Sequence, residues 1–330
     1  MRRAKAFLGL ELKDDVLKIV ELSKSDRGVY LERFVYERLP DGWVSGGVLL
    51  QPGLLNEFLQ DVIDREAFQT RKVHLSIDSP HFVLVEKTYP AMKKKDLRKV
   101  IALEIEEQME LPFNDPWYEV IALKKPQKKV EHSEWRVLLI LTSEAFVRTY
   151  ANVIRSCGLK PVSIDLAPLA IHRWLKYVRP KDEIEANIVI ANLSTHGVSV
   201  SAFTEHVLAK SHAIALPMSS FQTEQKANDF PYHLHKDQDI RDYTALLAAK
   251  LKSFVHDGSG NSEFILTGEG VSLYKVRDLL RNLNQEMDMR VTVLTGEIPI
   301  SEALLYRQLN HLKPSLCLPM GLALKGLVRA

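Results

Sequence analysis

The sequence predicts a mixed α/β protein built from two related halves. Stretches with apolar residues at alternate positions, typical of strands, are evenly interleaved with stretches of helical spacing. A strand–turn–strand pattern occurs twice, at residues 6–22 and 187–203, and the two copies start 181 residues apart. A period of half the chain indicates two lobes, because solenoid repeats are only ~20–50 residues long. Periodicity alone leaves chance similarity of two hairpins open.

The opening hairpin is the most regular of these patterns. Apolar residues alternate along residues 8–12 and again along 16–22, and the polar turn 13–15 joins the two strands. The same reasoning predicts strands at 29–40, 72–78 and 81–89 and a helix at 54–68.

The middle of the chain carries clear helix boundaries. Residues 94–113 have helical spacing, and Pro112 is expected to end this helix. Lysines stand at its start and glutamates at its end, against the helix dipole, which suggests that tertiary or partner contacts hold it. Residues 135–143 form a buried strand, and Ser143 and Gly158 are the N-cap and the stop of the helix between them.

Composition excludes several classes of protein. The chain has 44 Lys and Arg against 42 Asp and Glu, so no strong field favours nucleic acid. Cys157 and Cys317 each lie among apolar residues and are expected to be reduced and buried. The apolar run 137–141 is too short to span a bilayer, and Glu11 interrupts the N-terminal apolar run too early for a signal peptide. We expect a cytoplasmic protein with at most peripheral membrane contact.

Several separated segments resemble the PilM-type cytoplasmic assembly proteins of type IV pili, a family within the actin-like superfamily. These segments are residues 9–22, 96–115, 143–174, 263–283 and 318–327. Each motif is weak alone, but their order and spacing cover nearly the whole chain. The resemblance implies an α/β actin-like fold of two ribonuclease-H-like lobes with an inserted small α+β subdomain.

The resemblance also implies the domain layout. The first lobe would comprise residues 1–80, continued by 160–186 and 310–330. Residues 81–159 would form the inserted subdomain, and residues 187–309 the second lobe.

The first phosphate loop that the resemblance implies is altered at each functional position. Glu11 replaces the aspartate on the metal side, Lys13 replaces a glycine, and Asp14 and Asp15 replace two hydroxyl residues. A carboxylate close to a phosphate is repelled by roughly 4 kcal/mol per unit pair at intermediate dielectric. Lys13 would offset part of this repulsion, which is the best argument for residual nucleotide binding.

The second loop is altered as well. Ile190, Asn192 and His196 stand where the family has aspartate, glycine and threonine, and Pro217-Met218 replaces a pair of glycines. Ile190 cannot ligate Mg²⁺. The remnant nucleotide pocket would consist of Gly9, Lys13, Thr267, Gly268 and Gly270. We therefore predict a pseudo-ATPase without catalytic residues, metal ligands or cofactor, for which ATP and Mg²⁺ are residual ligands only.

Two further features have simpler interpretations. The histidines show no zinc-like spacing and are expected at the surface: His196, His206, His212, His233, His235 and His256. The basic runs 93–99 and 124–129 are interpreted as solvated surface, with attraction to an anionic membrane as the alternative.

The function that the resemblance implies is a non-catalytic scaffold of a type IV pilus, competence or secretion-type assembly machine. Such a scaffold lies at the inner face of the cytoplasmic membrane and binds the tail of a PilN-like single-pass membrane protein as an extended peptide. The alternatives are a nucleotide-binding ATPase of the actin or Hsp70 kind and an actin-like cytoskeletal or division protein. Self-association stays open.

Overall fold

The structure is a computed structural model of the chain. It describes residues 5–77, 81–126, 133–180, 184–221, 237–255, 263–269, 276–287, 290–295, 298–301, 304 and 313–328. The fold divides into two compact units. One unit comprises Met1–Ser79 and Val153–Ala330, and the other comprises Pro80–Asn152. The sequence-based lobe and subdomain boundaries stay predictions.

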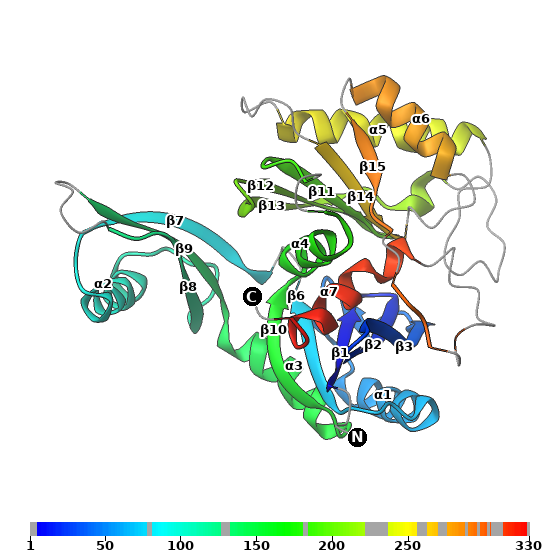
Figure 1. Cartoon of the computed structure of the whole chain (residues 1–330), viewed down its shortest axis with the longest axis horizontal. Helices are drawn as coiled ribbons and strands as arrows, with labels where there is room; N and C mark the ends of the chain where they lie inside the picture. The colour runs from blue at the N-terminus through cyan, green and yellow to red at the C-terminus, as the bar shows by residue number, and fades with distance from the viewer. Residues whose placement is uncertain are drawn as a thin grey trace. The chain divides into compact units, whose positions relative to one another are not determined.

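The larger unit contains a first five-stranded sheet with the order β10-β6-β1-β2-β3 (Figure 1). Strands β1, β2 and β3 form an antiparallel meander, and β6 and β10 add in parallel beyond β1. The strands are β1 (Lys5–Leu12), β2 (Val16–Ser25), β3 (Gly28–Arg38), β6 (Lys72–Ile77) and β10 (Lys160–Leu166). The alternation of residues 8–12 and 16–22 is confirmed as the β1–β2 hairpin.

A second five-stranded sheet repeats this topology, with the order β13-β12-β11-β14-β15. Its strands are β11 (Ile188–Leu193), β12 (Gly197–Thr204), β13 (Val207–Ala215), β14 (Glu263–Gly268) and β15 (Val291–Val293). Here too three antiparallel strands are followed by two parallel ones. The internal repeat is therefore confirmed, because β1–β2 and β11–β12 hold equivalent places.

Helices cover both sheets of the larger unit. They are α1 (Pro52–Glu66), α4 (Ala167–Val178), α5 (Asp237–Val255), α6 (Val276–Met287) and α7 (Cys317–Lys325). The last turn of α3 (Glu144–Ser156) joins them, whereas the residues of α3 up to Asn152 belong to the smaller unit. Helix α1 and the last turn of α3 share an apolar core with one face of the first sheet, and α5 and α6 share one with the second sheet. Helices α4 and α7 lie between the two sheets (Figure 1).

Residue Gly9 explains how closely α7 approaches the first sheet. A Cβ atom at this position would come within 1.9 Å of the Pro319 carbonyl oxygen and 2.7 Å of the Ala323 nitrogen. Because both are backbone atoms of α7, only a residue without a side chain allows this contact.

The smaller unit is a three-stranded antiparallel sheet with the order β7-β9-β8, covered on one face by α2. Its elements are β7 (Val83–Pro90), α2 (Lys94–Glu107), β8 (Pro116–Lys124) and β9 (Glu134–Ser143). Leu97, Ile101 and Ile105 recur on one helix face and are buried against β9.

The end predicted for α2 was wrong. The helix stops at Glu107 rather than near residue 113. Gln108, with a φ of −125°, has already left the helical conformation, so the helix ends before Pro112 can act on it. The expectation that tertiary or partner contacts hold this end is confirmed for one of its glutamates, Glu104. Glu104 accepts hydrogen bonds from Lys87 Nζ at 2.7 Å and from the Tyr89 hydroxyl at 2.6 Å.

The predicted boundaries of α3 are confirmed. Ser143 Oγ accepts a hydrogen bond from the Phe146 N–H at 3.3 Å, as an N-cap does. Gly158 has a φ of +81° and donates its N–H to the Arg155 carbonyl, which ends the helix.

Candidate functional site

The two equivalent hairpins bring their turns together at one place in the larger unit. The β1–β2 turn contributes Asp15, which is buried, and the β11–β12 turn contributes Thr195 and His196. The Thr195 hydroxyl donates a hydrogen bond to Asp15 Oδ2, and His196 Nε2 lies 3.6 Å from the same oxygen. The two segments that the resemblance pointed to as phosphate loops thus contact each other directly.

Lys18 lies at the centre of this site and is only 1% exposed. Its ammonium group lies 3.0 Å from Glu11 Oε2 and also pairs with Glu269 Oε1. Lys13 adds a second cation, with its Nζ 3.2 Å from Glu11 Oε1. These two lysines and two glutamates form one ion-pair cluster, which we call the Lys18 cluster. They come from β1, the β1–β2 turn, β2 and the residue that follows β14.

The electrostatics of the Lys18 cluster follow from burial and opposite charge. Burial acts to raise the pKa of the Glu269 carboxyl, but the charges of Lys18 and Lys13 outweigh it, so this pKa is lowered. Burial, together with the carboxylates of Glu269, Asp15 and Glu11, raises the pKa of Tyr36 far above its usual range. A glutamate that keeps its charge here depends on its lysine partner.

Asp14 has a structural role in the same turn. Its carboxylate accepts hydrogen bonds from the N–H groups of Gly46 and Gly47, at 2.7 and 3.0 Å. These glycines join two short strands, β4 (Val44–Ser45) and β5 (Val48–Leu49). The Asp14 carboxylate, which was expected to repel a phosphate, therefore accepts hydrogen bonds from the turn between β4 and β5.

Among the predicted pocket residues, Lys13 belongs to the Lys18 cluster, and close packing accounts for two of the others. Gly9 lies under α7, as described above, and Gly268 has a φ of +96°. A Cβ atom at Gly268 would lie 2.1 Å from the Leu193 carbonyl oxygen and 2.5 Å from Asn192 Oδ1. The Thr267 hydroxyl donates to the Pro314 carbonyl oxygen at 2.8 Å. Gly270 lies outside the described residues.

These residues do not fit a magnesium–triphosphate group. The lysines that could bind phosphate are already paired with glutamates, and Asp15 is hydrogen-bonded to Thr195. Ile190 is 1% exposed and offers no oxygen to a metal. Phosphate binding here would separate cations from carboxylates in a buried environment, where an unpaired charge is costly.

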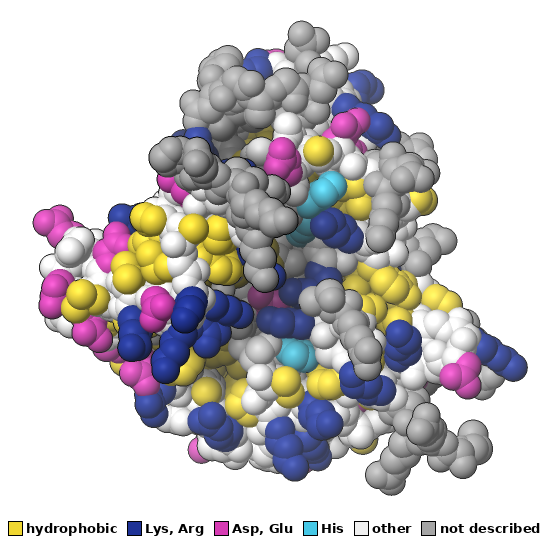
Figure 2. Space-filling view, turned by 60° about the vertical axis from the view of Figure 1, so that its left-hand side comes forward, with side chains coloured by type: hydrophobic (Ala, Val, Ile, Leu, Met, Phe, Trp, Pro, Cys, Tyr) yellow, Lys and Arg dark blue, Asp and Glu magenta, His cyan; other side chains and the backbone are white. Residues whose placement is uncertain are grey.

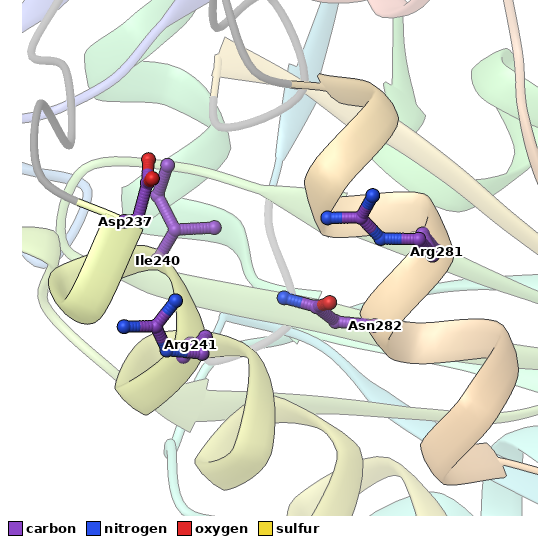
Figure 3. Close-up of a pocket in the computed structure, with 5 residues that line it drawn as sticks. All are labelled: Asp237, Ile240, Arg241, Arg281 and Asn282. Carbon is purple, nitrogen blue, oxygen red and sulfur yellow. The ribbon is translucent and has the colours of Figure 1, made fainter.

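A pocket in the second half of the larger unit lies between α5 and α6. Figure 3 shows its lining residues: Asp237, Ile240 and Arg241 on α5 and Arg281 and Asn282 on α6. Its volume of about 100 Å³ is below the ~300–1,000 Å³ typical of small-molecule sites.

Other sequence-based expectations concern thiols, metals and membranes. Cys157 and Cys317 are free and buried, as expected. Within the described ranges, no group of three or more His, Cys, Asp and Glu side chains is arranged to hold a metal. His196 and His212 are exposed, His206 is half-buried, and His233, His235 and His256 lie outside the described residues. No helix in the described part of the chain is long and apolar enough to cross a bilayer.

Lys18 and Glu269 were not among the site residues predicted from the sequence. A signal was present for Lys18, because it occupies a position where the alternation of β2 places buried side chains. A lysine on a buried strand face requires a buried anion, but the sequence does not say which one. Glu269 lies 251 positions away, in a motif that suggests only a turn.

Comparison with solved structures shows the actin-like fold. The chain aligns with a structure described as "PilM-PilN type IV pilus biogenesis complex" over 98% of both chains, with a TM-score of 0.79 and 20% identity. It aligns with the ethanolamine utilization protein EutJ from Carboxydothermus hydrogenoformans over 97% of this chain and 89% of that one, with a TM-score of 0.56 and 10% identity. It aligns with ADP-bound MreB5 of Spiroplasma citri over 96% of this chain and 94% of that one, with a TM-score of 0.51 and 9% identity.

Comparison with protein-family models and with curated proteins gives no match. The resemblance to PilM-type proteins is thus confirmed by structure, at the level of the fold. The two-lobed α/β class predicted from the sequence is confirmed as well.

Proposed function

We propose that this chain is a non-catalytic cytoplasmic component of a type IV pilus, competence or secretion-type assembly machine. It would hold the cytoplasmic tail of a PilN-like single-pass membrane protein at the inner face of the membrane. The observation that carries the proposal is the alignment with a PilM–PilN complex over 98% of both chains.

The Lys18 cluster supports a role that does not depend on nucleotide. Lys18 and Lys13 are neutralised by Glu11 and Glu269, so the site presents no net positive charge to a triphosphate. The ATPase alternative needs free donors and a metal held by carboxylate at this place. A protein that binds a tail needs neither.

The smaller unit offers features that suit an extended peptide. Strand β8 is an edge strand of the β7-β9-β8 sheet, paired on one side with β9. On β8, Trp117 is 55% exposed and Tyr118 is 36% exposed. A peptide that adds to a sheet edge gains backbone hydrogen bonds, and exposed aromatic residues are common anchors in protein interfaces.

The experiment is calorimetry with the full chain and a peptide of the cytoplasmic tail of a PilN-like single-pass membrane protein from the same organism. Trp117→Ala should weaken binding at least about tenfold, as loss of a central aromatic anchor does. Leu103→Ala is the matched control, because Leu103 lies on α2 in the same unit and is 52% exposed. This control should bind the peptide like the unchanged chain.

Two results would contradict the proposal. Equal binding of the tail and a scrambled tail would show that recognition is not specific. Magnesium-dependent ATP hydrolysis that disappears in Glu11→Gln would favour the ATPase alternative.

A further inference from the structure

One end of the first sheet concentrates positive charge. Lys5 of β1 lies directly opposite Lys24 of β2, and Lys72 of β6 lies directly opposite Lys160 of β10. All four side chains are exposed. We call this group the lysine end. It lies at the start of β1, whereas the Lys18 cluster lies at the other end of that strand, where Glu11 is directly opposite Lys18.

Like charges placed directly opposite on neighbouring strands destabilise a sheet. Within the described part of the chain, none of the four lysines forms an ion pair that would relieve this repulsion. Instead, the ammonium groups of Lys5 and Lys72 lie 5.3 and 5.7 Å from the centroid of the same Phe7 ring. The aromatic ring stabilises two cations and leaves their charge uncompensated.

The charge extends beyond the four lysines. Arg27, in the turn between β2 and β3, and Arg71, just before β6, are exposed at the same strand ends. Figure 2 shows Lys and Arg side chains gathered over the lower part of the view, where Figure 1 places the starts of β6 and β10. Because the whole chain has a net charge of only +2, this surface is a local feature.

We propose that the lysine end binds the surface of an anionic lipid bilayer. Lysine ammonium groups on short strand ends form a set of point charges, which suits a continuous layer of anionic headgroups. Single-stranded nucleic acid is a poorer fit, because Phe7 is only 6% exposed and lies beneath the lysines, where it cannot stack on a base. A nucleic-acid duplex, which needs no stacking ring, is distinguished by the test below. The proposal does not depend on tail binding, and its test uses no tail peptide.

The test is sedimentation of the full chain with vesicles containing about 30% phosphatidylserine in phosphatidylcholine, compared with pure phosphatidylcholine vesicles. Each basic residue near such a surface contributes about a factor of five to partitioning. The double variant Lys24→Gln/Lys160→Gln should therefore bind about 25-fold more weakly. It spares the Phe7 contacts and removes one charge from each opposed pair, so thermal unfolding should show unchanged or raised stability.

The matched control is Lys94→Gln/Lys95→Gln, which removes two exposed charges from the basic run 93–99 on α2. It should retain binding to within about twofold. Retention by the unchanged chain should also fall steeply between about 0.1 M and 0.5 M salt, because screening shortens the range of the attraction.

Four results would overturn the proposal. Equal retention on neutral vesicles, or no retention at low salt, would show that charge does not drive membrane binding. A loss confined to the α2 variant would assign the contact to the run 93–99. Tighter binding to a DNA duplex than to vesicles, lost in the Lys24→Gln/Lys160→Gln variant, would assign the surface to nucleic acid.

Discussion

The Lys18 cluster makes a quantitative prediction about stability. In Lys18→Met, Glu11 keeps its pair with Lys13, whereas Glu269 loses its closest cation while it is only 3% exposed. Removing one partner of a buried ion pair costs about 3–5 kcal/mol, because the other charge is left uncompensated. We expect the free energy of unfolding, measured by urea denaturation at pH 7, to fall by that amount.

A second variant separates the charge from the shape of the site. In Lys18→Met/Glu269→Gln the glutamine keeps the size of the glutamate and removes its charge. Most of the lost free energy should return, since replacing both members of a buried pair is far less costly than breaking it. Lys252→Met is the matched control: its ammonium lies 3.7 Å from Glu286 and both side chains are exposed, so it should cost at most about 1 kcal/mol.

The pH dependence tests the same reasoning. In the unchanged chain the pKa of Glu269 is lowered on folding, so its contribution to stability is present above the ordinary value of 4.5 and is lost as the pH falls through the folded value. In Lys18→Met burial alone should raise this pKa, so the deficit should shrink as the pH falls from 7 toward 4.5. A deficit below about 1 kcal/mol, or one that does not change with pH, would refute the cluster as a buried charge network.

Two further predictions concern packing and buried histidine. Gly9→Ala should lower the free energy of unfolding, measured by urea denaturation, by at least about 2 kcal/mol, because the added carbon meets the backbone of α7. The control is Gly53→Ala: its added carbon has no atom within 4 Å, so the change should be neutral or stabilising. Burial, with the charge of Lys325, lowers the pKa of His74 to about 4. The free energy of unfolding should therefore fall by up to about 3 kcal/mol as the pH drops from 6.5 to 4. In His74→Gln the free energy of unfolding should change less over the same pH range.

Local patterns predicted the hairpins and several helix ends because these depend on neighbouring residues. The alternation in β1 and β2 fixes which side chains share a face of the sheet, and Ser143 caps α3 through a contact three residues away. The partners of charged residues were not predictable in this way. Asp14 bonds to a turn 32 residues later, and Lys18 pairs with a glutamate from the other sheet. Such contacts are set by tertiary structure, which a single sequence does not display.

The residues of the expected nucleotide site divide into two groups by physical role. Gly9 and Gly268 belong to the nucleotide pocket that the resemblance implies. A Cβ atom at either position would lie about 2 Å from a backbone atom of a packed neighbour. Glycine is thus required there whether or not a nucleotide binds. The turn positions 13–15 carry no such steric requirement, and there the family's glycine and hydroxyl residues are replaced by Lys13, Asp14 and Asp15. Gly9 and Gly268 are therefore evidence of close packing. The residues at the turn tips, 13–15, are the ones that indicate whether the site can bind phosphate.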